Sequence, residues 1–262
     1  MNNKLIITAL FLVNSVFASS QIDTHTNLTY QQGRKQGHWI KKYPDETIMY
    51  DGFFKNDHPV GEFKRYYEDH TLKSILIYDE DGKKTNATLY HPNGNISSIG
   101  TYIDQRKEGK WQFYSVFTKG QKVSEEYYSG NLRNGLSLKF YQDSTLAEKL
   151  TYINGIKQGE WMQYYPSGAV LLKTNYLNGK LNGRFEVWFE NGTPEYSGQY
   201  KNDLRDSLWT VYNENGTVKY KLEYLAGVTN DHRMENDESN FLDSLENNKG
   251  KIADPEKTGI IR

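Results

Sequence analysis

The alternation of apolar and polar residues predicts β-strands through most of the chain. Two stretches show it most clearly, each just after a glycine: Val170, Leu172, Thr174 and Tyr176, and then Val218, Tyr220, Leu222 and Tyr224. The residues between them are mostly polar, and a period of two with one apolar side is typical of a half-buried strand. Asn-Gly and Ser-Gly pairs precede these strands, and glycine accepts the positive φ of a tight turn without steric cost. The pattern therefore predicts β-hairpins.

These hairpins repeat along the chain with a period of 24 residues. Six copies carry a glycine two residues before a conspicuous position that is usually a large aromatic, and the remaining two copies carry Thr or Ser instead: Gly37, Gly61, Thr85, Gly109, Gly135, Gly159, Gly183 and Ser207. The only irregular interval contains two extra residues near 116–119. Stacked hairpins of this kind make an elongated antiparallel sheet in which each unit contacts only its neighbours. We therefore predict an all-β, elongated antiparallel β-hairpin repeat solenoid or sheet.

The first strand of each repeat leaves one question open. Its two aromatic positions, such as Trp161 and Tyr164, are separated by an odd number of residues, so an ideal pleat places them on opposite faces of the sheet. A β-bulge would bring them to the same face.

The predicted organisation divides the chain into four parts. A leader at 1–20 and a linker or cap at 21–32 precede eight repeats, and a polar tail follows at 228–262. The expected repeat bounds are 33–57, 58–81, 82–105, 106–131, 132–155, 156–179, 180–203 and 204–227. Within the tail, residues 237–247 could form a short helix that caps the last repeat or docks a partner.

The leader has the three-part layout of a secretory signal peptide. Lys4 precedes an apolar run over 5–13, and small residues follow, so cleavage is expected after Ala18 or Ser20. The apolar run is too short to span a bilayer, and no later segment is long enough, so we expect no membrane span in the mature chain. The expected location is outside the cytoplasm: periplasm, cell surface or medium.

Composition narrows the function classes. The chain of 262 residues has 21 Tyr, 11 Phe and 5 Trp, which excludes wholesale disorder. A formal net charge of −1 argues against a nucleic-acid partner. The absence of cysteine removes disulfides, thiolate nucleophiles and cysteine-ligated zinc.

The sequence shows no recognisable catalytic motif. The six histidines have no metal-ligand spacing, and no nucleophile or phosphate-binding motif occurs. The adjacent carboxylates Glu125 and Glu126 are expected on opposite faces of a strand, which is poor geometry for acid–base catalysis. We therefore predict a non-enzyme with no cofactor and no metal.

One extended feature could form a binding site. A ladder of large aromatics recurs at the same place in six repeats: Trp39, Phe63, Trp111, Trp161, Phe185 and Trp209. Exposed, these rings would stack on sugars or on the apolar surface of a partner. The alternative interpretation is that they pack on one another as the core.

The unit from Tyr176 to Gly192, with the sequence Tyr-Leu-Asn-Gly-Lys-Leu-Asn-Gly-Arg-Phe-Glu-Val-Trp-Phe-Glu-Asn-Gly, resembles the MORN repeat variant of the YwqK-like bacterial family. The resemblance covers about 33–227 and departs at Thr85, Ala87, Ser137 and Ser207. It implies the fold above and a scaffold or attachment surface. The antitoxin label of that family implies a cytoplasmic partner, which conflicts with the leader.

The resulting functional prediction is an exported, non-catalytic repeat protein that binds a protein or envelope component. The first alternative is glycan or cell-wall binding through the aromatic ladder. The second is an antitoxin- or immunity-like protein, as the family label implies.

Overall fold

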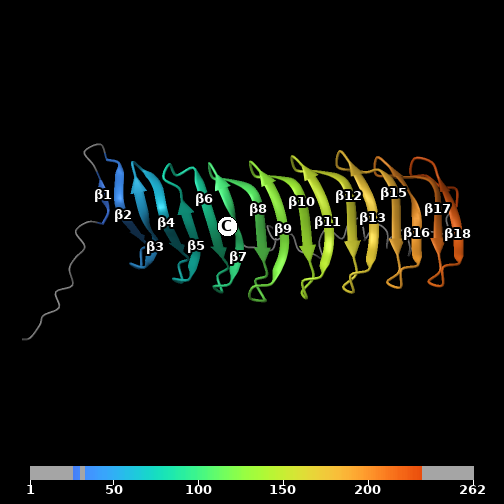
Figure 1. The fold of residues 1–262 in the computed structure, drawn as a ribbon, viewed down its shortest axis with the longest axis horizontal. Coiled ribbons are helices and arrows are strands. Elements are labelled where there is room, and N and C mark those ends of the chain that lie inside the picture. The colour runs from blue at the N-terminus through green and yellow to red at the C-terminus, as the bar shows by residue number, and fades with distance from the viewer. Residues whose placement is uncertain (1–25, 30–32, 232–262) are drawn as a thin grey trace, which may run out of the picture.

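The computed structural model describes residues 26–29 and 33–231, and within them the chain forms a single row of antiparallel strands (Figure 1). Each strand pairs with the next one along the chain, and β13 pairs with both β14 and β15. Of the linker and the tail, the structure describes only 26–29 and 228–231, so the signal peptide, its cleavage sites and the segment 237–247 lie outside the described residues. The all-β, hairpin-repeat prediction is confirmed.

The strands occupy the following residues: β1 Leu28–Thr29, β2 Lys35–Lys42, β3 Ile48–Lys55, β4 His58–Tyr66, β5 Leu72–Tyr78, β6 Lys84–Tyr90, β7 Ile96–Ile103, β8 Arg106–Tyr114, β9 Lys122–Ser129, β10 Leu132–Phe140, β11 Leu146–Ile153, β12 Ile156–Tyr164, β13 Val170–Leu177, β14 Lys180–Leu181, β15 Gly183–Trp188, β16 Pro194–Lys201, β17 Leu204–Tyr212 and β18 Val218–Tyr224.

Two kinds of turn alternate between the strands. Within a repeat the turn ends in a residue with positive φ, and Gly168, Gly192 and Gly216 hold φ of 87°, 83° and 80° as their positions predict. Between repeats a two-residue turn has positive φ at both positions, as at Asn178 and Gly179, where φ is 52° and 82°. This is the turn whose twist matches that of the flanking strands.

A bulge bends the first strand of most repeats. In the pairing of β11 with β12, Leu150 of β11 pairs with Trp161, but Thr151, the next residue of β11, pairs with Gln158. Gly159 and Glu160 of β12 therefore have no partner on β11, which defines the bulge. Gly159 has φ of 76°, a conformation that glycine adopts freely. The bulge does not bring the two aromatics together: Trp161 is buried, whereas the hydroxyl of Tyr164 lies 3.4 Å from the sulfur of Met162, its neighbour on the other face.

The sheet has a buried inner face and a polar outer face. The strands curve along their length (Figure 1). The inner face carries the ladder ring of the first strand in six of the eight repeats, and a tyrosine or phenylalanine near the end of each second strand. Phe185, for example, lies 5.1 Å from Tyr200 and 5.6 Å from Trp209, measured between ring centroids. Contacts of this size between rings contribute about 0.5–1.5 kcal/mol each beyond their buried area.

Glycines on the inner face form notches that receive the ring of the following repeat. A Cβ built on Gly198 would lie 2.2 Å from an indole carbon of Trp209, and one on Gly100 would lie 2.2 Å from Trp111. Real Cβ atoms do not approach so closely, so only glycine fits at these positions. The contact between the second and third repeats reverses the sizes: Leu76 stands at the notch position and pairs with Ala87.

Tyrosine hydroxyls form hydrogen bonds between neighbouring repeats at four places. The hydroxyls of Tyr43, Tyr67, Tyr141 and Tyr165 each donate a hydrogen bond to the carbonyl of the residue 23 positions later, over 2.6–2.9 Å. The imidazole of His91 makes the corresponding contact with the Tyr114 carbonyl at 3.1 Å. Burial raises the pKa of Tyr67, Tyr141 and Tyr165, so these phenols remain protonated donors at neutral pH.

Candidate functional sites

The aromatic ladder lies in the core. Phe63, Trp111, Trp161, Phe185 and Trp209 are at most 3% exposed. Trp39 is partly buried, and its indole nitrogen donates to the carbonyls of Gln36 and Leu28 over 3.1 and 3.2 Å. The five buried rings present no free face to a sugar or a partner, and the core interpretation describes their position.

The row of rings is interrupted at two places, and each interruption has its own chemistry. Ala87 stands at the ladder position of the third repeat and Ser137 at that of the fifth. The buried residues accordingly form two apolar clusters, one reaching from Phe63 to Tyr128 and the other from Leu150 to Tyr224.

The fifth repeat replaces the missing ring by a buried polar cluster. Glu126, only 1% exposed, pairs with Ser137 across the strands. Its Oε2 accepts hydrogen bonds from the Arg133 Nε at 2.8 Å and from the Tyr128 hydroxyl at 2.5 Å. Burial alone would lower the pKa of Arg133, but the negative charge of Glu126 and the neighbouring tyrosines Tyr128 and Tyr152 outweigh burial and raise it, so Arg133 remains a cation.

A second ion pair extends this polar cluster. The ammonium of Lys139 lies 3.0 Å from a carboxylate oxygen of Glu148, and the amide of Gln163 reaches the other oxygen at 3.5 Å. The charges of this cluster are therefore paired with one another inside the sheet.

The third repeat leaves a cavity in place of a ring. We call it the N-terminal cavity; its volume is about 520 Å³. Phe63, Leu76, Tyr78, Leu89 and Tyr102 form its apolar wall. Thr85 and Leu89, which flank Ala87 on the same side of β6, both line it.

The backbone of the third repeat differs as well. Thr85 occupies the anchor position where six other repeats have glycine with positive φ, and the ladder between β5 and β6 runs without a register shift. A β-branched residue resists positive φ, so the bulge is lost. The missing ring, the missing bulge and the cavity therefore coincide in one repeat.

The cavity has a basic rim. Among the described residues, His58, Arg65 and Lys73 line it and no acidic residue does. The Arg65 guanidinium lies 5.7 Å from the ring centroid of Phe63, and the Lys73 ammonium lies 5.2 Å from that of Tyr67. Burial raises the pKa of Tyr78, although the charge of Arg65 partly offsets this, so the Tyr78 phenol is neutral at pH 7.

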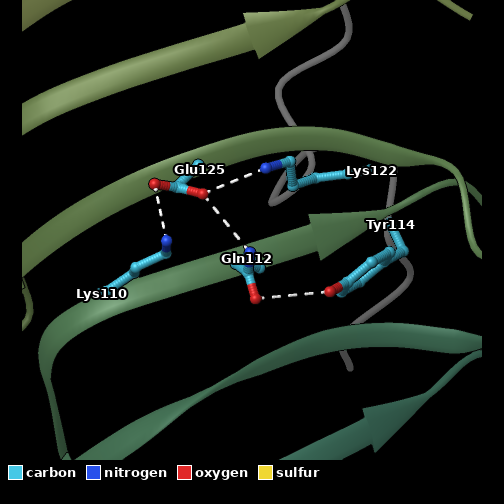
Figure 2. Close-up of polar contacts among 5 residues, drawn as sticks. All are labelled: Lys110, Gln112, Tyr114, Lys122 and Glu125. Atoms are coloured by element: carbon cyan, nitrogen blue, oxygen red, sulfur yellow. Dashed lines mark hydrogen bonds and ion pairs between the residues drawn. The ribbon is translucent and has the colours of Figure 1, made fainter. Parts of the chain in front are cut away.

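The outer face carries ion pairs, the largest of which Figure 2 shows between β8 and β9. The carboxylate of Glu125 lies 2.9 Å from the Lys110 ammonium and 3.1 Å from that of Lys122, and the Gln112 amide donates to it at 3.4 Å. Burial would raise the pKa of Glu125, but the hydrogen bonds from the two lysines outweigh burial and lower it. Glu125 and Glu126 thus lie on opposite faces, as predicted.

Exposed aliphatic side chains follow one long edge of the sheet, at the turns between repeats. We call this set the turn row; all members are between 46% and 79% exposed: Leu132, Ile153, Ile156, Leu177, Leu204, Leu225 and Val228. Each turn is hydrogen-bonded to the preceding one, as by the Gly155 amide to the Arg133 carbonyl at 2.7 Å and the Gly179 amide to the Lys157 carbonyl at 2.9 Å. The row is therefore held on a fixed backbone.

The comparison with protein families identifies the repeat. Segments 86–104, 157–178, 181–202 and 205–226 match the MORN repeat variant, each inside one predicted repeat. Four of the eight hairpin repeats therefore match this repeat variant. The first match covers the third repeat, so the MORN pattern persists there although its ring is missing.

Other comparisons add little about these MORN-type repeats. No curated protein matches the sequence. A mutant of S. aureus TarM, in complex with Fondaparinux, alpha-GlcNAc-glycerol and UDP, has a TM-score of 0.28 and 9% identity over 37% of this chain and 19% of its own. A second TarM crystal structure has a TM-score of 0.27, with the same identity and coverage. The match thus spans about a fifth of TarM, and likeness at this level carries no argument about function.

Within residues 26–29 and 33–231, no helix is long and apolar enough to cross a membrane. No group of three or more His, Asp or Glu side chains in the described segments is arranged to hold a metal ion.

Proposed function

We propose that this protein is an exported, non-catalytic interaction module that binds a protein partner along the turn row. The observation that carries the proposal is the row itself: seven exposed aliphatic side chains on the edge of the MORN-type repeats. Exposed apolar side chains that gather on one part of a protein surface are typical of interaction sites.

The turn row is pre-organised for binding. The side chain of Ile156 lies over the turn glycine Gly179, 3.3 Å from a Cβ built there, and Leu204 lies over Gly227 in the same way. Because the turns already hold these side chains in place, a partner would order little of the chain on binding. Lys180 and Lys201 interrupt the row and favour a partner with both apolar and acidic side chains.

The location and the absence of catalysis are part of the same proposal. The leader at 1–20 supports export, and it conflicts with the cytoplasmic partner that the YwqK-like antitoxin resemblance implies. The buried charges of the fifth repeat are engaged with one another, which favours a structural role. Burial of the aromatic ladder leaves the glycan alternative without the surface on which it depended.

Site-specific photo-cross-linking in the producing cells would test the turn row. A benzoylphenylalanine at Ile156 should give an adduct with a second protein, and Ile153→Lys with Leu177→Lys should abolish it. Phe117, 93% exposed in a turn within a repeat, provides the matched control position. The same adduct from position 117, or no adduct from position 156, would show that the turn row is not the binding surface. An adduct between two copies of the chain would replace the proposed partner by self-association.

Export has its own measurement. The intact mass of protein recovered from the envelope or the medium should correspond to a chain that begins at Ser19 or Gln21. A full-length chain confined to the cytoplasm would contradict export and favour the antitoxin alternative.

A further inference from the structure

The third repeat lacks an inner-face ring and has a cavity bordered by ring-bearing repeats. Phe63 precedes the gap and Trp111 follows it, and both are buried. We propose that the N-terminal cavity binds a small molecule with a planar apolar body and one acidic group. This inference is independent of the turn row, which lies on the turn edge of later repeats.

Small side chains at neighbouring positions enlarge the gap. Ser74, 4% exposed, lines the cavity, whereas the equivalent residues in other repeats include Tyr50, Tyr196 and Tyr220. Ala87 replaces a ring, and Leu76 fills only part of the space because it pairs directly with Ala87. A volume of about 520 Å³ is within the range of small-molecule sites and exceeds what one aromatic side chain would fill.

The walls define the body of the ligand. The rings of Phe63 and Tyr78 meet edge to face with centroids 6.1 Å apart, and Tyr102 packs in the same way on Trp111 at 4.8 Å. Faces and edges of rings therefore border the cavity on both sides of the gap. A planar, apolar body can make the stacked and edge contacts that the missing ring would have made.

The rim defines the charge of the ligand. Arg65 and Lys73 form no ion pair within the described residues, and the cavity lining contains no carboxylate. The inner-face lysine of the fifth repeat behaves differently, because Lys139 is paired with Glu148 at 3.0 Å. Two cations beside an apolar wall favour a ligand anion, to which arginine can donate two parallel hydrogen bonds.

A matched pair of fluorescent probes would test both parts of the proposal. 8-Anilinonaphthalene-1-sulfonate has two ring systems and one sulfonate, and N-phenyl-1-naphthylamine has the same rings without the charge. The full chain should bind the sulfonate saturably with one site per chain, and it should bind the neutral probe at least tenfold more weakly. Arg65→Gln together with Lys73→Gln should weaken sulfonate binding by about tenfold, since two partly exposed charged contacts are lost.

Variants and controls make the test specific. Ser74→Tyr should abolish binding of both probes, because it places in the cavity a side chain that other repeats carry at that position. Lys64→Gln removes one charge next to Arg65, but from the ion pair with Glu62 on the outer face, and should change nothing. Circular dichroism of each variant would verify the fold.

Three results would overturn the proposal. Equal affinity for the two probes would refute the acidic group. Sulfonate binding that Ser74→Tyr leaves intact in a folded protein would place the probe elsewhere. Several weak sites per chain, insensitive to the Arg65 and Lys73 substitutions, would show non-specific adsorption.

Discussion

The fit of the Trp209 ring into the notch at Gly198 can be tested by substituting both residues with the pair that another position of the repeat already carries. The contact between the second and third repeats places Leu76 at the notch and Ala87 at the ring position. We therefore consider Gly198→Leu, Trp209→Ala and the double variant, which would copy that contact into the one between the last two repeats.

The single substitutions should both be costly. Gly198→Leu forces a side chain to within 2.2 Å of the buried indole, and overpacking of this kind costs about 1–3 kcal/mol or more. Trp209→Ala removes the ring contacts with Phe185 and Tyr200 and the hydrogen bond to the Gln199 carbonyl at 3.2 Å. Truncating a buried tryptophan costs about 3–5 kcal/mol.

The double variant distinguishes a fitted notch from two independent positions. Once the indole is absent, the leucine can fill the space, and burying a leucine contributes about 1.5–3 kcal/mol. Adding Gly198→Leu to Trp209→Ala should therefore cost nothing or stabilise, so the coupling free energy should be about 2–4 kcal/mol.

Urea unfolding followed by far-ultraviolet circular dichroism would give the free energies. Hydrogen exchange of β16 and β17 would show whether the loss is local, as expected for a repeat protein. Gly192→Leu is the control: φ is 83° there and a Cβ meets nothing within 4 Å, so its cost should add to that of Trp209→Ala without coupling. A coupling energy near zero for Gly198 and Trp209 would refute the notch.

Three further substitutions have expected outcomes. Ser207 holds φ of 61° where six repeats have glycine, so Ser207→Gly should raise the free energy of unfolding by about 0.5–1 kcal/mol in thermal or urea melts, and no change would contradict strain there. The pKa of Glu125 is lowered from 4.5, so ionised Glu125 stabilises the folded chain above pH 4.5, and this stabilisation is lost as the pH falls through the lowered pKa. Glu125→Gln should therefore make the melting temperature fall less steeply over that acid range. An unchanged slope would show that the lysine contacts of Figure 2 contribute nothing to stability. Arg133→Met should cost about 3–5 kcal/mol in urea unfolding because Glu126 is left as a buried charge, and adding Glu126→Gln should recover part of it; an additive double variant would argue against the ion pair.

The sequence predicted the period and the turns because both depend on backbone conformations that few residues adopt. Gly168, Gly192 and Gly216 were predicted to have positive φ because glycine is the residue that adopts this conformation most readily. The face on which the rings lie depends instead on the curvature of the whole sheet, so the sequence left both the core and the exposed interpretations of Trp161 and Trp209 open. The burial of Trp209 is accompanied by a notch at Gly198, 11 residues earlier, a relation that periodicity within one repeat does not display.

The candidate sites were predictable to different degrees. Thr85 and Ala87 were visible as departures from the repeat, and that departure is the signal of the N-terminal cavity. The pairing of Glu126 with Arg133 could not be read from spacing, because it joins neighbouring strands across a turn and a bulge. The sequence analysis did not predict the hydroxyl hydrogen bonds of Tyr43, Tyr67, Tyr141 and Tyr165, because the carbonyls that they reach lie 23 residues away and are brought near only by the stacking of repeats.

The position of a notch also determines which recombination sites in the gene would keep a ring and its notch together. Gly198 and Trp209 lie on β16 and β17, on either side of the turn between two repeats. A crossover at that turn would inherit a ring from one parent and its notch from another, whereas a crossover at the turn inside a hairpin would transmit both together. For the Gly198–Trp209 contact, the unit that can be exchanged without separating ring and notch is therefore offset by half a period from the hairpin.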